Sequence, residues 1–267
     1  MPKYLQLTRP AQSVWQIALD SPPDNRIVPA LLEELHEALD RVEAEWRKAG
    51  GAVLDPRKRA EYAGKGAGAL VFTSALQKFF SNGLDYEGSL KIEHFFERMY
   101  DPVMWRLLTF PLLTVAAING HVFAGGMILA LCCDYRIMTS GIGFMCMSEL
   151  TFGAPLPHSF SSMLVSRIPH PQHLRDTLLA RRWTQKELIN IGLIDEVVEQ
   201  QQVISRAVEY GAKEGIKVAS GSWGLIKEGI FRPILESSQS YKPVVQPKEA
   251  EKRFWERIER DSVKAKL

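Results

Sequence analysis

The sequence predicts an α/β fold with a helical layer added at its C-terminal end. Short apolar runs bounded by turn residues alternate with helical patterns from residue 14 to residue 198, and the chain beyond has helical character. Of the 267 residues, 46% are hydrophobic and 24% are charged, which excludes a disordered chain. We expect a core over residues 1–200 and a helical region over residues 201–267, both in one domain unit.

The first predicted elements are a strand and an amphipathic helix. Val14–Leu19 has the apolar character of a strand and ends in the turn Ser21–Asn25. Over Pro29–Lys48, apolar residues recur every three or four positions, which predicts a helix with one buried face. That face comprises Leu31, Leu32, Leu35, Leu39 and Val42. The glycine-rich and basic segment Gly50–Gly68 predicts a loop.

The middle of the chain predicts a buried sheet. Ala69–Thr73 and Leu112–Ile118 are apolar strands, and each leads into a turn that contains glycine. Phe123–Cys133 predicts a buried helix, and Tyr135–Met138 and Gly143–Met147 predict two further short strands.

The last predicted strand follows a short capped helix. Thr184 and Glu187 form a capping box, Gly192 ends that helix, and Leu193–Val198 is the strand. From residue 200 onward, prolines divide the helical region into segments. These prolines are Pro233, Pro243 and Pro247.

Charge and cysteine content narrow the class of protein. The 33 basic and 31 acidic residues leave a net charge of +2, which argues against a nucleic-acid partner. The uncharged stretch between Arg106 and Asp134 is broken by Pro111 and by glycines, so we reject a membrane span. The chain has an odd number of cysteines, Cys132, Cys133 and Cys146, which favours a reducing compartment. Cys132 and Cys133 are expected to pack within the helix.

Two glycine turns are candidates for chemistry. In Ser81–Asp85, Gly83 permits a positive φ, which lets the Leu84 N–H point into a cleft instead of a sheet. The second turn, Asn119–Gly126, leads into the buried helix, where a glycine offers an unpaired N–H with the helix dipole behind it. Two such N–H groups converging on one oxygen would form an oxyanion hole.

At these turns the sequence resembles the crotonase superfamily, the enoyl-CoA hydratases and isomerases. Four blocks carry the resemblance over nearly the whole chain: Ser21–Asp40, Phe80–Asp85, Pro111–Tyr135 and Leu178–Val198. The resemblance implies a spiral fold of repeated ββα units, homotrimers or hexamers, and a coenzyme A thioester as substrate. Coenzyme A then enters as part of the substrate, and no separate cofactor is expected.

The resemblance also implies roles for individual residues. The N–H groups of Leu84 and Gly125 align with the family's two oxyanion donors. The family uses the first loop to bind the pantetheine and adenine ends of coenzyme A. The resemblance therefore implies that a run of five residues contacts the substrate. They are Asn82, Gly83, Leu84, Asp85 and Tyr86.

Carboxylates select the reaction within the family. Hydratases use two glutamates to activate water; here the first position is Ile128 and the second is Glu149. A third acidic position, used by dienoyl-CoA isomerases and by some enoyl-CoA isomerases, is Pro157. One carboxylate suffices for a 1,3 proton shift, and the apolar neighbours of Glu149 favour a raised pKa. The pattern looks like the peroxisomal 3,2-enoyl-CoA isomerases of fungi and plants, with Glu149 as the acid-base.

Other interpretations stay open from the sequence. The chain is alternatively a hydratase or a specialised peroxisomal acyl-CoA enzyme of secondary metabolism, or a non-catalytic acyl-CoA-binding subunit. Asp85 either contacts coenzyme A or caps a helix, and Lys78 either meets a phosphate or is solvated. No metal site is expected, because the histidines are irregularly spaced. They are His121, His158, His170 and His173.

The last three residues, Ala265, Lys266 and Leu267, resemble a peroxisomal S-K-L address. We therefore expect the peroxisomal import receptor as a partner and the peroxisome as the location.

Overall fold

Two sheets, in which most neighbouring strands are parallel, form the centre of the fold. The computed structural model describes residues 2–52, 55, 57, 65–240 and 243–264. The larger sheet has the order β1-β2-β3-β5-β7-β9, in which β1 is antiparallel to β2 and the other neighbours are parallel. Its strands are β1 (Leu5–Ala11), β2 (Val14–Leu19), β3 (Ala69–Ser74), β5 (Leu113–Ile118), β7 (Tyr135–Thr139) and β9 (Glu196–Val198). The smaller sheet is parallel and comprises β4 (Phe79–Ser81), β6 (His121–Phe123) and β8 (Met145–Cys146).

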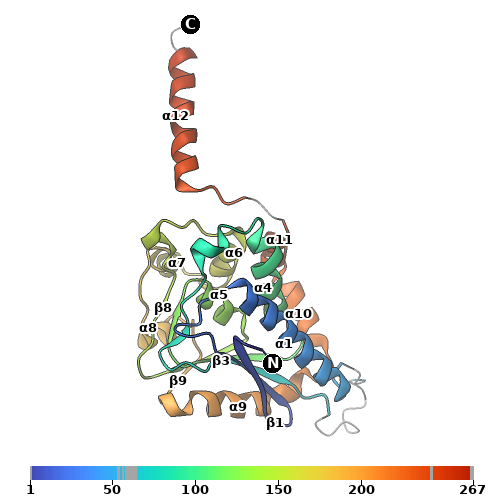
Figure 1. Cartoon of the computed structure of the whole chain (residues 1–267). Coiled ribbons are helices and arrows are strands. Elements are labelled where there is room, and N and C mark those ends of the chain that lie inside the picture. The colour runs from blue at the N-terminus through green and yellow to red at the C-terminus, as the bar shows by residue number, and fades with distance from the viewer. Residues whose placement is uncertain (1, 53–54, 56, 58–64, 241–242, 265–267) are drawn as a thin grey trace.

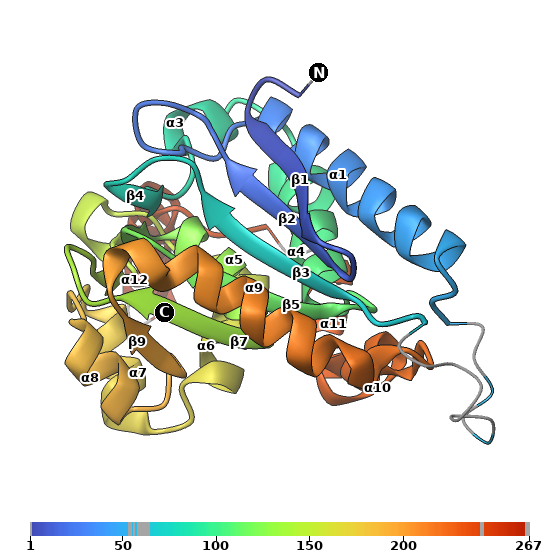
Figure 2. The same cartoon turned by 90° about the horizontal axis from the view of Figure 1, so that it is seen from below.

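Both faces of the larger sheet are covered by helices, as its apolar strands require. Leu70 and Phe72 belong to the cluster that holds α1 (Pro29–Lys48), whereas Ala69 and Val71 pack in the cluster beneath α9 (Val203–Glu214). This alternation follows from the two-residue period of a strand. Figure 2 shows α9 running across the sheet on the side opposite α1.

The amphipathic pattern of α1 is confirmed. The predicted apolar face is buried and extends to Trp46, whose indole Nε1 donates to the Gly66 carbonyl at 2.8 Å. This contact ties the end of α1 to one end of the predicted loop Gly50–Gly68; residues 53–54, 56 and 58–64 of that loop lie outside the described residues.

The remaining helices surround the sheets and form the C-terminal layer. They are α3 (Tyr86–Ser89), a π-helix (Phe96–Tyr100), α4 (Asp101–Leu108), α5 (Gly125–Cys132), a 3₁₀ turn (Glu149–Phe152), α6 (His158–Arg167), α7 (Pro171–Leu178), α8 (Gln185–Asn190), 3₁₀ turns at Gln200–Gln202 and Gly215–Val218, α10 (Ser222–Ile230), α11 (Arg232–Gln239) and α12 (Pro247–Lys264). Pro233 and Pro247 begin helices, as predicted, and α12 extends away from the body (Figure 1). Among the described helices, none has both the length and the apolar character needed to cross a bilayer.

Several boundaries differ from the sequence prediction. The strands expected at Gly143–Met147 and Leu193–Val198 shorten to β8 and β9. β1 was not predicted, because most of its side chains are polar or partly exposed and Pro10 interrupts it, as an edge strand permits. The capping box of Thr184 and Glu187 at the start of α8 is confirmed. The three cysteines are free and buried.

Candidate active site

The first glycine turn leaves one backbone N–H without a partner. Gly83 has a φ of +83°, and Leu84 forms an isolated parallel bridge with Ile27. The Ile27 N–H donates to the Gly83 carbonyl at 2.8 Å, and the Asp85 N–H donates to the Ile27 carbonyl at 3.0 Å. Because these flanking groups make the bridge, the Leu84 N–H points to the opposite side, where it has no acceptor among the described residues.

The second turn presents the free end of α5. Ala124 has a φ of +51°, and its N–H donates to the Cys146 carbonyl at 2.9 Å. Gly125 follows as the first residue of α5, so its N–H belongs to the unpaired, positive end of the helix. The Tyr100 hydroxyl donates to the Gly125 carbonyl at 2.6 Å from a fully buried position.

The two turns lie against each other. A Cβ added to Gly83 would lie 2.6 Å from the Ala124 Cβ and 3.3 Å from the Gly125 nitrogen. A Cβ added to Gly125 would lie 3.2 Å from the Leu84 Cγ. Glycine is therefore required at position 83 both for its φ and for this close approach.

Glu149 supplies a buried carboxyl beside these turns. It begins a 3₁₀ turn that ends at Gly153, which has a φ of +73°. Its side chain is 8% exposed, and its Oε2 atom is buried without a hydrogen-bond partner among the described residues. Burial raises the pKa of Glu149 to about 7, because an ion is poorly solvated there. The prediction of a raised pKa agrees with this environment.

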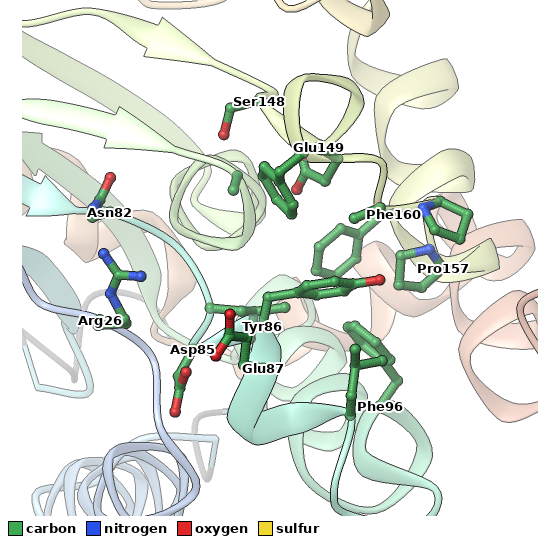
Figure 3. Close-up of a pocket in the computed structure, with 16 residues that line it drawn as sticks. Arg26, Asn82, Asp85, Tyr86, Glu87, Phe96, Ser148, Glu149, Pro157 and Phe160 are labelled. Atoms are coloured by element: carbon green, nitrogen blue, oxygen red, sulfur yellow. The ribbon is translucent and has the colours of Figure 1, made fainter. Parts of the chain in front are cut away.

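One cavity of about 680 Å³ joins these features. Asn82, Leu84, Asp85, Tyr86 and Glu149 line it, whereas Gly83 and Gly125 are not among its lining residues. Figure 3 shows a polar end with two labelled side chains, Arg26 and Asn82, and an opposite end formed by Phe96, Pro157 and Phe160.

The two positions at which the resemblance would place further acids hold Ile128 and Pro157. Ile128 is fully buried in the core, and Pro157 lines the cavity. Asp85 and Glu87 also line the cavity, but Asp85 accepts from the Gly88 N–H as the cap of α3, and Glu87 is exposed. Glu149 is therefore the buried acid of the described cavity wall.

Some cavity residues were missed by sequence reasoning. Arg26 pairs with Asp24 at 2.8 Å, and the same carboxylate accepts from the Asn82 side chain at 2.7 Å. This pairing orients the polar end of the cavity. Phe96 and Phe160 come from a π-helix and from α6, two elements without a clear periodic pattern.

The other candidate residues lie elsewhere. Lys78 packs over the Phe79 ring at 5.4 Å and does not line the cavity. His121 stacks on Phe144 with ring centroids 5.5 Å apart. Within residues 2–264 as far as they are described, no three histidine, cysteine or acidic side chains form a metal-binding group.

Comparisons with known proteins identify the family of this chain. A family model described as enoyl-CoA hydratase/isomerase matches residues 62–220. The peroxisomal enoyl-CoA delta isomerase 2 of Arabidopsis thaliana is 32% identical over 177 residues, which are 61% of this chain and 74% of that protein. Enoyl-CoA delta isomerase 3 of the same plant is 30% identical over 175 residues, with the same shares. The mitochondrial enoyl-CoA delta isomerase 1 of Mus musculus is 33% identical over 145 residues, 52% of this chain and 50% of that one.

Solved structures show the same fold at lower identity. An enoyl-CoA hydratase/isomerase family protein from Pseudomonas syringae has a TM-score of 0.73 at 17% identity, covering 89% of this chain and 94% of that one. An enoyl-CoA hydratase from Bacillus anthracis has a TM-score of 0.66 at 23% identity, covering 85% and 82%. The crotonase-like α/β fold is thus confirmed, and this chain belongs to the enoyl-CoA hydratase/isomerase family of enzymes.

Proposed function

We propose that this protein is an enoyl-CoA isomerase that moves the double bond of a 3-enoyl-CoA to the trans-2 position, during fatty-acid β-oxidation. The observation that carries the proposal is the buried carboxyl of Glu149, which has a free oxygen in a cavity bordered by two turns with unpaired N–H groups. The names of the Arabidopsis and mouse relatives support the same reaction.

In the proposed reaction, Leu84 and Gly125 donate their backbone N–H groups to the thioester carbonyl oxygen. Glu149 removes a proton from C2 of the acyl chain, and the electron pair of that C–H bond moves toward the carbonyl as a dienolate forms. The two N–H groups stabilise this negative charge; losing one such donor costs about 3 kcal/mol of barrier. Glu149 then returns the proton to C4, so that the atoms balance without water or a further cofactor.

The absence of a second buried acid from the described cavity wall favours isomerisation over hydration. Water addition needs one group to hold the water and another to deliver a proton, whereas a 1,3 shift reuses one carboxyl. With Ile128 and Pro157 at the other two positions, Glu149 alone is suited to proton transfer.

The remaining cavity wall suggests how the substrate lies. We propose that Asn82, Gly83, Asp85 and Tyr86 contact the coenzyme A portion, next to Arg26 at the polar end. The Tyr86 ring meets Phe152 edge-to-face at 5.4 Å, and its hydroxyl donates to the Gln246 side chain at 3.4 Å. The ring contact joins α3 to the 3₁₀ turn of Glu149, and the hydroxyl contact joins α3 to the segment that precedes α12.

Location and assembly extend the same proposal. We propose the peroxisome, as the names of two Arabidopsis relatives suggest, although the mouse relative is mitochondrial. The proposed receptor-binding tail, Ala265 to Leu267, lies outside the described residues. A homotrimer or hexamer is the proposed assembly, and α12 offers the exposed apolar residues Phe254, Trp255 and Ile258 as a contact surface.

The test is conversion of 3-hexenoyl-CoA, followed by the absorbance of the conjugated thioester. We expect turnover by the natural protein and a loss of about a thousandfold in Glu149→Gln, which cannot exchange the proton. Incubation with trans-2-hexenoyl-CoA is the comparison: faster formation of a 3-hydroxyacyl product than of the isomer would make the protein a hydratase. Thioester binding without any turnover would identify a binding subunit.

A further inference from the structure

A second cavity lies beyond the apolar end of the reaction cavity. It has a volume of about 280 Å³ and shares Leu90, Phe96 and Pro157 with the larger cavity. One layer of side chains therefore separates the two spaces. Figure 3 shows Phe96 and Pro157 at this end, away from Arg26 and Asn82.

The far side of this layer carries polar groups beside apolar ones. Its polar lining includes Asp101, His158, Ser159, Ser237, Ser238 and Gln246. Asp101 is 5% exposed, and its Oδ1 accepts from the Ser159 hydroxyl at 2.8 Å. Its Oδ2 accepts no hydrogen bond from the described residues and is not fully buried, so it is open to water or to a ligand in the cavity.

The backbone that places Asp101 is unusual. His94 has a φ of +59°, and a π-helix follows over Phe96–Tyr100. Such π-turns are rare and occur often at functional sites. The turn directs Phe96 toward the Phe160 ring at a centroid distance of 5.6 Å, and it ends where Asp101 enters the second cavity.

We propose that the second cavity binds the distal end of the acyl chain, and that Asp101 selects chains that end in a hydroxyl group. This inference rests on the proposed function, because it takes the thioester to lie at the polar end beside Glu149. A chain running from there meets the layer of Leu90, Phe96 and Pro157 first, and this layer has to part before the chain reaches the Asp101 carboxyl.

The chemistry of the lining favours a neutral hydroxyl over other end groups. A hydroxyl can donate to the free Oδ2 of Asp101 and accept from a serine of the same wall. A terminal carboxylate would meet Asp101 and Glu93, two groups of its own charge. A terminal ammonium would have to leave water to pass the apolar layer, which is costly for an ion. A methyl end would leave Asp101 without a donor. Burial raises the pKa of Asp101 to about 7, in line with its poor solvation.

The test compares pairs of 3-enoyl-CoA substrates, with and without a terminal hydroxyl, from six to fourteen carbons. We expect equal kcat/KM within the pair for the short chains. Above the length that reaches the second cavity, the hydroxylated chain should be favoured about tenfold, the value of one hydrogen bond to a carboxyl. Asp101→Leu should abolish this preference, and Asp101→Asn should reduce it. Each ratio compares the kcat/KM values of two substrates for the same variant. A partial loss of folded protein therefore does not change the ratio.

Glu209→Gln is the control, since this acid lies on α9, pairs with Arg206 and lines neither cavity. It should keep the preference. The inference would be overturned by equal rates within every pair for the natural protein, by survival of the preference in Asp101→Leu, or by its loss in Glu209→Gln. Failure to convert 3-hexenoyl-CoA would instead contradict the proposed function.

Discussion

Glu149 shows how a single residue can favour chemistry at the expense of stability. Its carboxyl is buried beside apolar groups with one oxygen unpaired. An ionised group in that position lacks the solvation that it has in the unfolded chain, and its pKa rises from 4.5 to about 7. A base with a pKa near the working pH is suited to proton exchange.

The same shift predicts a pH-dependent stability. Between pH 4.5 and about pH 7 the unfolded chain releases the Glu149 proton while the folded chain keeps it, so stability falls as the pH rises. At pH 8 the raised pKa of Glu149 lowers the free energy of unfolding by about 3 kcal/mol, whereas below pH 4.5 it has little effect on that free energy. We therefore expect Glu149→Gln to be more stable than the natural protein at pH 8, with little difference at pH 4. Urea unfolding at the two pH values measures this, and an equal difference at both would contradict it.

At the scale of elements, the π-helix and α5 are linked by one hydrogen bond. Tyr100 donates to the Gly125 carbonyl at 2.6 Å, and its ring packs against Phe160 at 4.9 Å. The bond fixes the first residue of α5, whose N–H we propose as an oxyanion donor. Tyr100 is therefore a positioning residue.

Removing this bond should affect the rate more than binding. For Tyr100→Phe we expect kcat to fall about tenfold with KM little changed, because the ring packing is kept while the turn loosens. Steady-state kinetics with 3-hexenoyl-CoA measures the two constants. Tyr210→Phe on α9 is the control, since Tyr210 stacks on Tyr135 instead of lining the cavity. A larger change in KM than in kcat would argue against a positioning role.

The elements also show what the sequence could and could not predict. α1 was predictable because Leu31, Leu35 and Leu39 repeat at helical spacing toward one core. α6 was not, because serines interrupt its buried face, as Ser159 does. The two turns were found from their glycines, and Glu149 was found through the resemblance to the crotonase superfamily. Tyr100 and Asp101 were not found, because they depend on a π-helix that tertiary packing stabilises.

At the scale of the whole molecule, the C-terminal helices are joined to the sheet by a buried ion pair. Asp134, between α5 and β7, lies 3.1 Å from the Lys227 Nζ of α10 and accepts from the Trp223 indole at 2.9 Å. It also accepts from the Thr114 N–H of β5 at 2.9 Å. The expected single unit of residues 1–200 and 201–267 stays a prediction, and this pair offers a way to test it.

Asp134→Asn should leave the Lys227 ammonium buried without its counter-charge, because Lys227 is 1% exposed. Breaking a buried pair in this way costs about 3 kcal/mol or more. If the helical layer and the sheet unfold together, the variant should show one transition at lower denaturant concentration, seen alike by far-UV circular dichroism and by tryptophan fluorescence. The double variant Asp134→Asn with Lys227→Met, which removes both charges and keeps the side-chain volume, should lose less stability. An early separate transition of the helices would show instead that residues 201–267 form their own unit.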